Sequence, residues 1–240
     1  MKYDIVLWDF DGTLANTGQD VWGSLEYAAR VLGGEIRKQF RADDSNLGKS
    51  MEEIFLAIEP ALDDGLQEKF EELVKVHYRT LHEFPQTVLY PGMEKLLNDL
   101  KAEGVMNFII TLKPQEALER ILTNKGWARY FSGWLSPDSF VNADRVYRLS
   151  EADPEGNLPR VGRICTKSQL IAYFLKETGE GKRIIYVGDT YSDVEACEDN
   201  GLDCIGVTYG DGDTQALLAA KPAAVVADVD MIGKLLKEGI

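Results

Sequence analysis

The sequence predicts an α/β fold, a Rossmann-like parallel sheet with helices on both faces, together with an inserted α-helical domain. From Pro91 onward, apolar runs of strand length alternate with helical patterns, which is typical of βαβ units in a parallel sheet. One further strand-like run lies near the N-terminus, and residues 17–83 carry only helical patterns. We therefore expect a core domain of residues 1–16 and 84–240 and a helical domain of residues 17–83.

The first strand and the helical insert are distinguished by the spacing of their apolar residues. The run at residues 3–8, YDIVLW, has the composition of a strand that enters a core. Within the insert, apolar residues recur every three or four positions, as they do along one face of a helix. Three such patterns span residues 21–32, 51–58 and 66–78, and the insert contains no convincing strand.

Glycine and proline bound the elements that follow the insert. A helical pattern over residues 93–100 ends at Gly104. Pro114 opens the next helix, which ends at Gly126. The remaining predicted elements are a helix at 164–178 and strands at 105–110, 183–187, 203–207 and 223–227.

Composition and charge exclude several classes of partner. The 240 residues carry a formal net charge of -14, and both nucleic acid and an anionic membrane require a basic surface that this chain lacks. No apolar run reaches the roughly 18 residues of a membrane span, and no secretory signal is visible. The three cysteines have no CxxC spacing, so neither a disulfide framework nor a zinc site is indicated. We expect a cytoplasmic protein that is a monomer or a weak homodimer.

Polar residues follow three of the predicted strands, where ligands bind in parallel sheets. Asp9 and Asp11 come after the first strand, Thr111 after the second, and Asp189 and Asp193 after the strand at 183–187. Because several ionised carboxylates at one sheet edge repel one another, the arrangement requires a counter-charge. A set of oxygen ligands suits Mg²⁺, so we expect a magnesium site there.

These residues resemble the four motifs of the haloacid dehalogenase superfamily of phosphatases. The motifs are DFDGTL at residues 9–14, a strand ending in Thr111, a lysine one helix before the next strand, and GDTYSD at 188–193. The helical insert resembles the C1 cap of that superfamily, and the layout is similar to its phosphoglycolate phosphatase-like and β-phosphoglucomutase-like subfamily. The resemblance covers nearly the whole chain.

The resemblance implies the reaction and the acids that carry it out. Asp9 would be the nucleophile that forms an aspartyl-phosphate. Asp11 would protonate the leaving oxygen and then deprotonate the attacking water. Mg²⁺ would be held by Asp9, the Asp11 carbonyl and Asp189, and Asp193 would either bind the ion directly or support its ligands. The substrate would be a small phosphorylated metabolite.

The resemblance also implies which groups bind the phosphoryl group. Thr111 and the Leu112 N–H would bind its oxygens, and Gly12 would let the chain turn so that backbone N–H groups approach it. Lys167 would neutralise its charge. This sequence reads Thr111-Leu112-Lys113 where many relatives read TNK or SNK, so one side-chain amide is missing.

Several alternatives stay open. The cation could be Lys113 or Arg163 rather than Lys167, although we expect Pro114 to begin a helix at once and turn the Lys113 side chain outward. The long stretch at 135–163 is expected to form a hairpin or flap. A phosphosugar mutase could use the same scaffold. A non-enzymatic phospho-receiver is the third hypothesis, although its length and chain order fit less well. The sequence does not identify the substrate.

Overall fold

The computed structural model describes residues 1–137, 140–142, 145–147 and 166–240, which divide into two compact units. One unit, called the core unit below, contains residues 1–15 and 89–240. The other, called the insert, contains residues 16–88. The sequence-based boundaries, after residues 16 and 83, lie one residue later and five residues earlier than this division.

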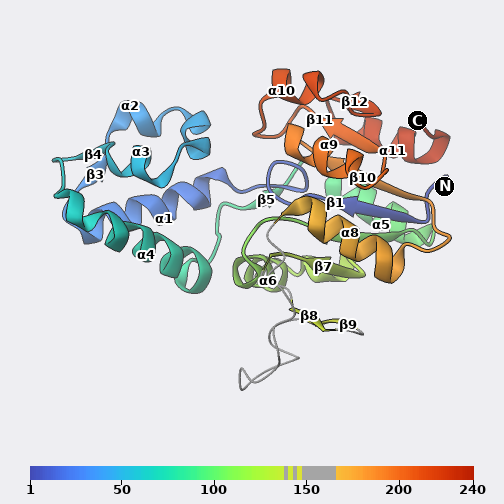
Figure 1. Ribbon diagram of the computed structural model, residues 1–240, viewed down its shortest axis with the longest axis horizontal. Helices are drawn as coiled ribbons and strands as arrows, with labels where there is room; N and C mark the ends of the chain where they lie inside the picture. The colour runs from blue at the N-terminus through green and yellow to red at the C-terminus, as the bar shows by residue number, and fades with distance from the viewer. Residues whose placement is uncertain (138–139, 143–144, 148–165) are drawn as a thin grey trace. The chain divides into compact units, whose positions relative to one another are not determined.

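The core unit is built on a six-stranded parallel sheet, which confirms the predicted fold class (Figure 1). The order of its strands is β12-β11-β10-β1-β6-β7, so the first strand of the chain lies in the interior of the sheet. Leu7 of β1 pairs with Phe108 on one side and with Tyr186 on the other. The strands are β1 (Ile5–Trp8), β6 (Met106–Ile110), β7 (Gly133–Leu135), β10 (Ile184–Gly188), β11 (Cys204–Val207) and β12 (Ala224–Val226).

Strand β7 is a strand that the sequence analysis missed. It has three residues, Gly-Trp-Leu, and pairs only along β6 at the edge of the sheet. A run this short shows no period, and its glycine disfavours a strand by composition. The pairing with β6 therefore stabilises β7 against its own weak propensity.

Helices cover both faces of the sheet, as the sequence predicts. In Figure 1, α8 and α9 lie in front of the sheet and α5 lies behind it. Ile5 and Leu7 point to the face that α8 and α9 cover, where the free thiols of Cys197 and Cys204 are also buried. The helices are α5 (Met93–Ala102), α6 (Gln115–Asn124), η4 (Trp127–Tyr130), α8 (Lys167–Thr178), α9 (Tyr191–Glu198), α10 (Thr214–Ala219) and α11 (Val229–Glu238).

The stretch after β7 contains an antiparallel strand pair, β8 (Phe140–Asn142) and β9 (Arg145–Tyr147). The sequence analysis expected a hairpin or flap at 135–163, and these two strands agree with the hairpin. Residues 148–165, with Arg163 and Cys165, lie outside the described residues. In the described part of the chain, every helix is too short or too polar to cross a membrane.

The insert has an apolar cluster of its own, to which Trp22, Leu25, Ile54 and Phe70 contribute. Its elements are α1 (Gly18–Val31), α2 (Lys38–Arg41), η1 (Asp44–Gly48), α3 (Met51–Phe55), η2 (Asp64–Leu66), α4 (Gln67–Val76) and η3 (His77–Leu81). The expectation that it lacks strands was wrong. The two-residue strands β3 (Glu35–Ile36) and β4 (Ile58–Glu59) pair antiparallel, and two residues are too few to show a period.

The chain passes between the units through β2 (Ala15–Asn16) and β5 (Val88–Leu89), which pair in a two-stranded sheet. Just before β5, the chain is tied to helix α1 by the buried carboxylate of Asp20. This carboxylate accepts hydrogen bonds from Thr87 Oγ1 at 2.7 Å and from the Gln86 N–H at 3.1 Å. His82 Nε2 lies 2.8 Å from Asp20 Oδ1. Asp20 therefore fixes the path by which the chain leaves the insert.

We predict that Asp20→Ala destabilises the insert by about 2 kcal/mol, because it leaves buried donors without an acceptor. Unfolding by urea, followed by amide hydrogen exchange in residues 16–88, measures the change. Glu72→Ala, which removes an exposed carboxylate from α4, should change stability by less than about 0.5 kcal/mol. Equal stability of the Asp20→Ala and Glu72→Ala proteins would show that the Asp20 hydrogen bonds contribute little.

Candidate active site

The ends of three neighbouring strands bring the predicted acids together. Asp9 follows β1 and Asp189 follows β10, which pairs with β1, while Thr111 follows β6 on the other side. All three side chains are buried. The Asp9 N–H donates to the Val187 carbonyl at 2.9 Å, so the sheet ladder itself fixes the backbone at Asp9.

Three carboxylates form a buried acidic cluster at this edge. Each of Asp9, Asp189 and Asp193 offers one oxygen, and these oxygens all lie within 4.8 Å of one another. Burial, together with the charges of the neighbouring aspartates, raises the pKa of Asp9 to about 7 despite the opposing effect of Lys167. Burial and the charge of Asp193 likewise raise the pKa of Asp189 to about 6. The cluster therefore favours a bound cation.

Lys167 supplies one positive charge to the acidic cluster. Its Nζ lies 2.9 Å from Asp9 Oδ2 and also contacts Asp193 Oδ1. Burial alone would lower the pKa of this lysine, but the charges of Asp9 and Asp193 raise it above its usual value. Lys167 is the first residue of α8, and Thr166 begins that helix with a capping box. A helix start therefore holds the lysine against Asp9.

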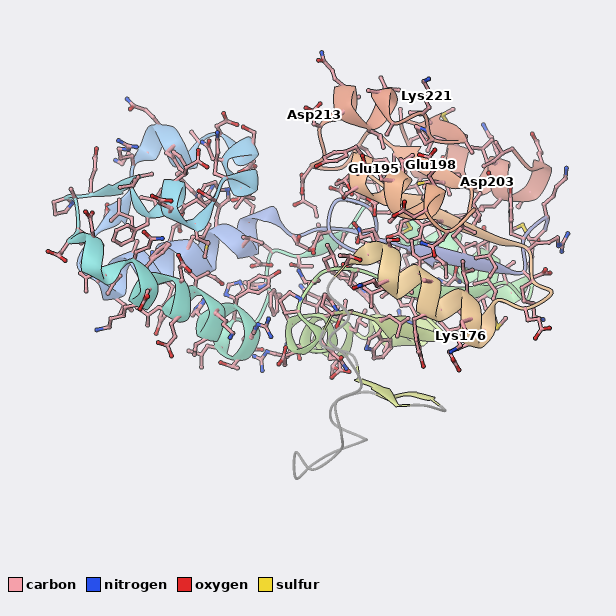
Figure 2. The ribbon with its side chains drawn as sticks, in the orientation of Figure 1. Lys176, Glu195, Glu198, Asp203, Asp213 and Lys221 are labelled. Carbon is pink, nitrogen blue, oxygen red and sulfur yellow. The ribbon has the colours of Figure 1, made fainter. Side chains whose placement is uncertain are left out.

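Asp193 has both of its carboxylate oxygens bound within the protein. Oδ1 accepts from Lys167 and from the Tyr186 hydroxyl at 3.1 Å. Oδ2 accepts from the Thr190 hydroxyl at 2.6 Å and from the Thr190 N–H at 3.0 Å, which completes a capping box on α9. Asp193 is fully buried, whereas Glu195 and Glu198 of the same helix are exposed (Figure 2). These contacts fix the Asp193 carboxylate, so it can hold the Lys167 ammonium group in place.

The Asp189 carboxylate is oriented from two sides. Thr13 Oγ1 donates to Oδ1 at 3.1 Å, and the Gly212 N–H donates to Oδ2 at 3.0 Å. Thr13 is in turn held by the Tyr209 hydroxyl, which donates to its carbonyl at 2.9 Å. The first motif and the loop after β11 therefore position Asp189 together.

Two glycines allow the backbone to approach this carboxylate closely. Gly12 has φ of +74°, and a Cβ there would lie 2.1 Å from Asp189 Oδ2. A Cβ at Gly210 would lie 2.2 Å from the Gly12 carbonyl oxygen. The sequence analysis identified Gly12 but missed the loop after β11, with Gly210 and Gly212. The rule that ligands bind at strand ends, applied also to the strand at 203–207, would have found it.

The orientation expected for Lys113 was wrong. Its side chain is only 1 % exposed, and its Nζ lies 2.7 Å from Asp11 Oδ1. Pro114 is the N-cap of α6 and has an extended conformation, so the helix begins at Gln115. Because a residue that precedes proline is kept out of the helical region, Lys113 can stay on the same side of the chain as Thr111.

The other predicted site residues include Thr111, Leu112 and Asp11. Thr111 Oγ1 is buried and accepts from the Lys113 N–H at 3.2 Å. Leu112 is exposed, with 48 % of its surface accessible. The Asp11 side chain is 39 % exposed, so it is reachable from solvent, unlike Asp9.

The residues present fit a divalent cation. The acidic cluster and the first motif, with the two lysines that contact them, contribute four carboxylates and two ammonium groups: Asp9, Asp11, Asp189, Asp193, Lys113 and Lys167. Buried charge of one sign requires compensation. The donors are hard oxygen atoms, which suit Mg²⁺ better than a softer metal.

Comparisons with known proteins find related sequences over most of the chain. Residues 6–143 match the family model for haloacid dehalogenase-like hydrolases, and residues 166–232 match a second model of HAD-like hydrolases. The chain is 26% identical to a phosphoglycolate phosphatase of Vibrio vulnificus (strain CMCP6), over 97% of this chain and 94% of that one. It is also 26% identical to a phosphoglycolate phosphatase of Pseudomonas savastanoi pv. phaseolicola, over 94% and 76% of the two chains.

A solved structure shares the fold over its whole length. It is a crystal structure of a predicted phosphoglycolate phosphatase from Haemophilus somnus, with a TM-score of 0.73 and 22% identity. The match covers 98% of this chain and 99% of that one. At this identity the match supports the architecture alone.

We predict that the metal-free protein loses at least ~2 kcal/mol of stability between pH 5 and pH 7.5. The native state keeps protons on Asp9 and Asp189 up to about pH 7 and pH 6, whereas the unfolded chain loses them near pH 4. Since the native state then binds more protons than the unfolded one, stability falls as pH rises through this window. Urea unfolding in EDTA measures the change.

Two comparisons serve as controls for this prediction. Asp9→Asn should flatten the pH profile, because it removes one of the two carboxyls. Added Mg²⁺ should stabilise the protein more at pH 7.5 than at pH 5, because the ion competes with protons for the same oxygens. A metal-free protein that gains stability from pH 5 to pH 7.5 would contradict the assigned shifts.

Proposed function

The chain belongs to the haloacid dehalogenase-like hydrolases and is a phosphatase of that family, and from this premise we propose that it is a Mg²⁺-dependent phosphomonoesterase that acts through an aspartyl-phosphate. The observation that carries the proposal is the position of Asp9. Its carboxylate is buried at the end of β1, with Lys167 2.9 Å away on one oxygen and with Asp189 beside it.

Asp9 is the proposed nucleophile. Lys167 contacts its Oδ2, so Oδ1 is the oxygen that we propose attacks phosphorus. Asp11 gives a proton to the leaving oxygen as the P–O bond breaks. It then takes a proton from the water that hydrolyses the aspartyl-phosphate. The partial exposure of Asp11 suits this exchange, because its carboxyl can reach both substrate and water.

The phosphoryl group is bound by groups that surround Asp9. Lys167 neutralises its charge, and the Thr111 hydroxyl and the Leu112 N–H bind its oxygens. Gly12 allows the backbone to turn beside it. These residues hold the phosphorus in line with Asp9 while the leaving oxygen faces Asp11.

Asp9, Asp189 and the Asp11 carbonyl would hold Mg²⁺. When bound, the ion neutralises the negative charge of the carboxylates and of the phosphate. Asp193 supports this set through Lys167, because both of its oxygens are already bonded within the protein. Of the two roles expected for Asp193, direct binding of the ion or support of its ligands, we propose the second.

The proposed substrate is a small phosphorylated metabolite, with phosphoglycolate as the first compound to test. The support is the name of the curated relatives, which match 94% or more of this chain. We propose that the insert acts as a cap that selects the substrate, as in the C1-capped members of the superfamily. We also propose a cytoplasmic location, which the free thiols of Cys197 and Cys204 support, and a monomer or weak homodimer.

Phosphate release from a panel of phosphorylated metabolites, with Mg²⁺ and with EDTA, tests the function. We expect hydrolysis that depends on Mg²⁺ and is strongest for one or a few small compounds. Isomerisation of a sugar phosphate without net release would favour the phosphosugar mutase instead. A protein that takes up phosphate on Asp9 but never releases it would favour the phospho-receiver.

We predict that Asp9→Asn and Asp11→Asn each abolish turnover and leave the fold intact, because each removes a group that takes part in bond making or proton transfer. Mass spectrometry of the quenched wild-type reaction should find phosphate on Asp9. Hydrolysis at near wild-type rate by Asp9→Asn would remove the covalent mechanism.

We predict that Lys167→Ala costs about 3 kcal/mol of transition-state stabilisation, roughly 150-fold in kcat/KM. The reason is the loss of the ammonium group beside Asp9. Lys176→Ala is the matched control, because Lys176 is an exposed residue of the same helix (Figure 2). Similar kcat/KM values for the two variants would exclude Lys167 as the phosphate-neutralising cation.

A further inference from the structure

A second buried lysine lies at the candidate site, on the side of Asp11. The Lys113 side chain is 1 % exposed, and its Nζ contacts Asp11 Oδ1 at 2.7 Å and lies 5.5 Å from the centre of the Phe10 ring. The two lysines thus contact different acids of the first motif. Lys167 reaches Asp9 from α8, and Lys113 reaches Asp11 from the turn between β6 and α6.

The cost of burying Lys113 indicates that its position matters. An ammonium group taken out of water is destabilising unless it is paired and hydrogen-bonded. Asp11, its partner, has 39 % of its side chain exposed. It could therefore have paired with an exposed lysine at the surface instead of a buried one. A pair that served stability alone would gain little from this arrangement, because exposed ion pairs contribute ~1 kcal/mol or less.

The local chain holds Lys113 in place from both sides. Its N–H donates to Thr111 Oγ1 at 3.2 Å, and Pro114 follows it as the N-cap of α6. The proline restricts the backbone of Lys113, and the strand end fixes Thr111. The ammonium group is therefore presented to Asp11 from a constrained turn.

We propose that Lys113 is a positioning residue for Asp11, a role that rests on the proposed function. Lys113 holds Oδ1 and so fixes the rotation of the carboxyl group relative to the leaving oxygen. As the P–O bond breaks, the proton moves from the Asp11 carboxyl group to the leaving oxygen, and the carboxylate that forms faces the ammonium group. Lys113 keeps its own proton throughout and touches neither phosphorus nor the leaving group.

The dependence on the leaving group tests this role. An alkyl phosphate requires protonation of its leaving oxygen, whereas p-nitrophenyl phosphate releases a stable phenolate that needs little help. The ratio of kcat/KM for the two substrates isolates the step that Asp11 assists, because kcat/KM covers the reaction only up to departure of the leaving group. A structural defect that lowers the amount of active protein changes both values equally and leaves the ratio unchanged.

We expect Lys113→Met to lower kcat/KM for the alkyl phosphate at least about 10-fold more than for p-nitrophenyl phosphate. Lys113→Arg, which restores a positive charge, should bring the ratio part of the way back. Lys95→Met removes an exposed lysine that pairs with Asp99 at 2.6 Å and serves as the matched control.

The outcomes distinguish a failure of the role proposed for Lys113 from a failure of the proposed phosphatase function. If Lys113→Met does not fold, Lys113→Gln keeps a donor in the buried site without the charge and carries the same comparison. Equal losses on both substrates, or an unchanged ratio in a folded variant, would overturn the role of Lys113 and leave the phosphatase standing. Absence of hydrolysis by the wild-type protein on every phosphomonoester would remove the proposed function together with this inference.

Discussion

The structure of the core unit depends on one electrostatic constraint, which is the gathering of buried carboxylates at one edge of a parallel sheet. Oxygens of Asp9, Asp189 and Asp193 lie within 4.8 Å of one another in a place that water hardly reaches. Like charges at such distances cost several kcal/mol unless they are compensated. Lys167 compensates part of this charge and the loop after β11 orients Asp189, so elements far apart in sequence contribute to stabilising the cluster.

Asp193 shows that one side chain can both cap a helix and contact a residue of the candidate site. One carboxylate oxygen closes the capping box of α9, and the other binds Lys167 and Tyr186. The two sets of contacts are compatible, because a helix N-terminus stabilises the same negative charge that the lysine contacts.

Sequence alone predicted the features that depend on local pattern. The strands that precede Asp9 and Asp189 are apolar runs that end in acids. The resemblance identified Lys167, whose ammonium group lies beside Asp9 in the structure. The sequence analysis missed features that depend on one particular residue nearby in the chain or in space. Lys113 turns inward because Pro114 caps α6 instead of joining it, and the glycine loop after β11 resembles an ordinary turn until its contact with Asp189 is known.

The order of the strands has a consequence for how the chain folds while it is being made. Strand β1 emerges first, yet its partners lie about a hundred and about 180 residues later, at Met106 and Ile184. At roughly 5–20 residues per second, its apolar run waits on the order of 10–40 s for its last neighbour. The insert is continuous in sequence and has its own apolar cluster, so it can fold during that interval. The proposed nucleophile is thus synthesised well before the residues that complete its surroundings.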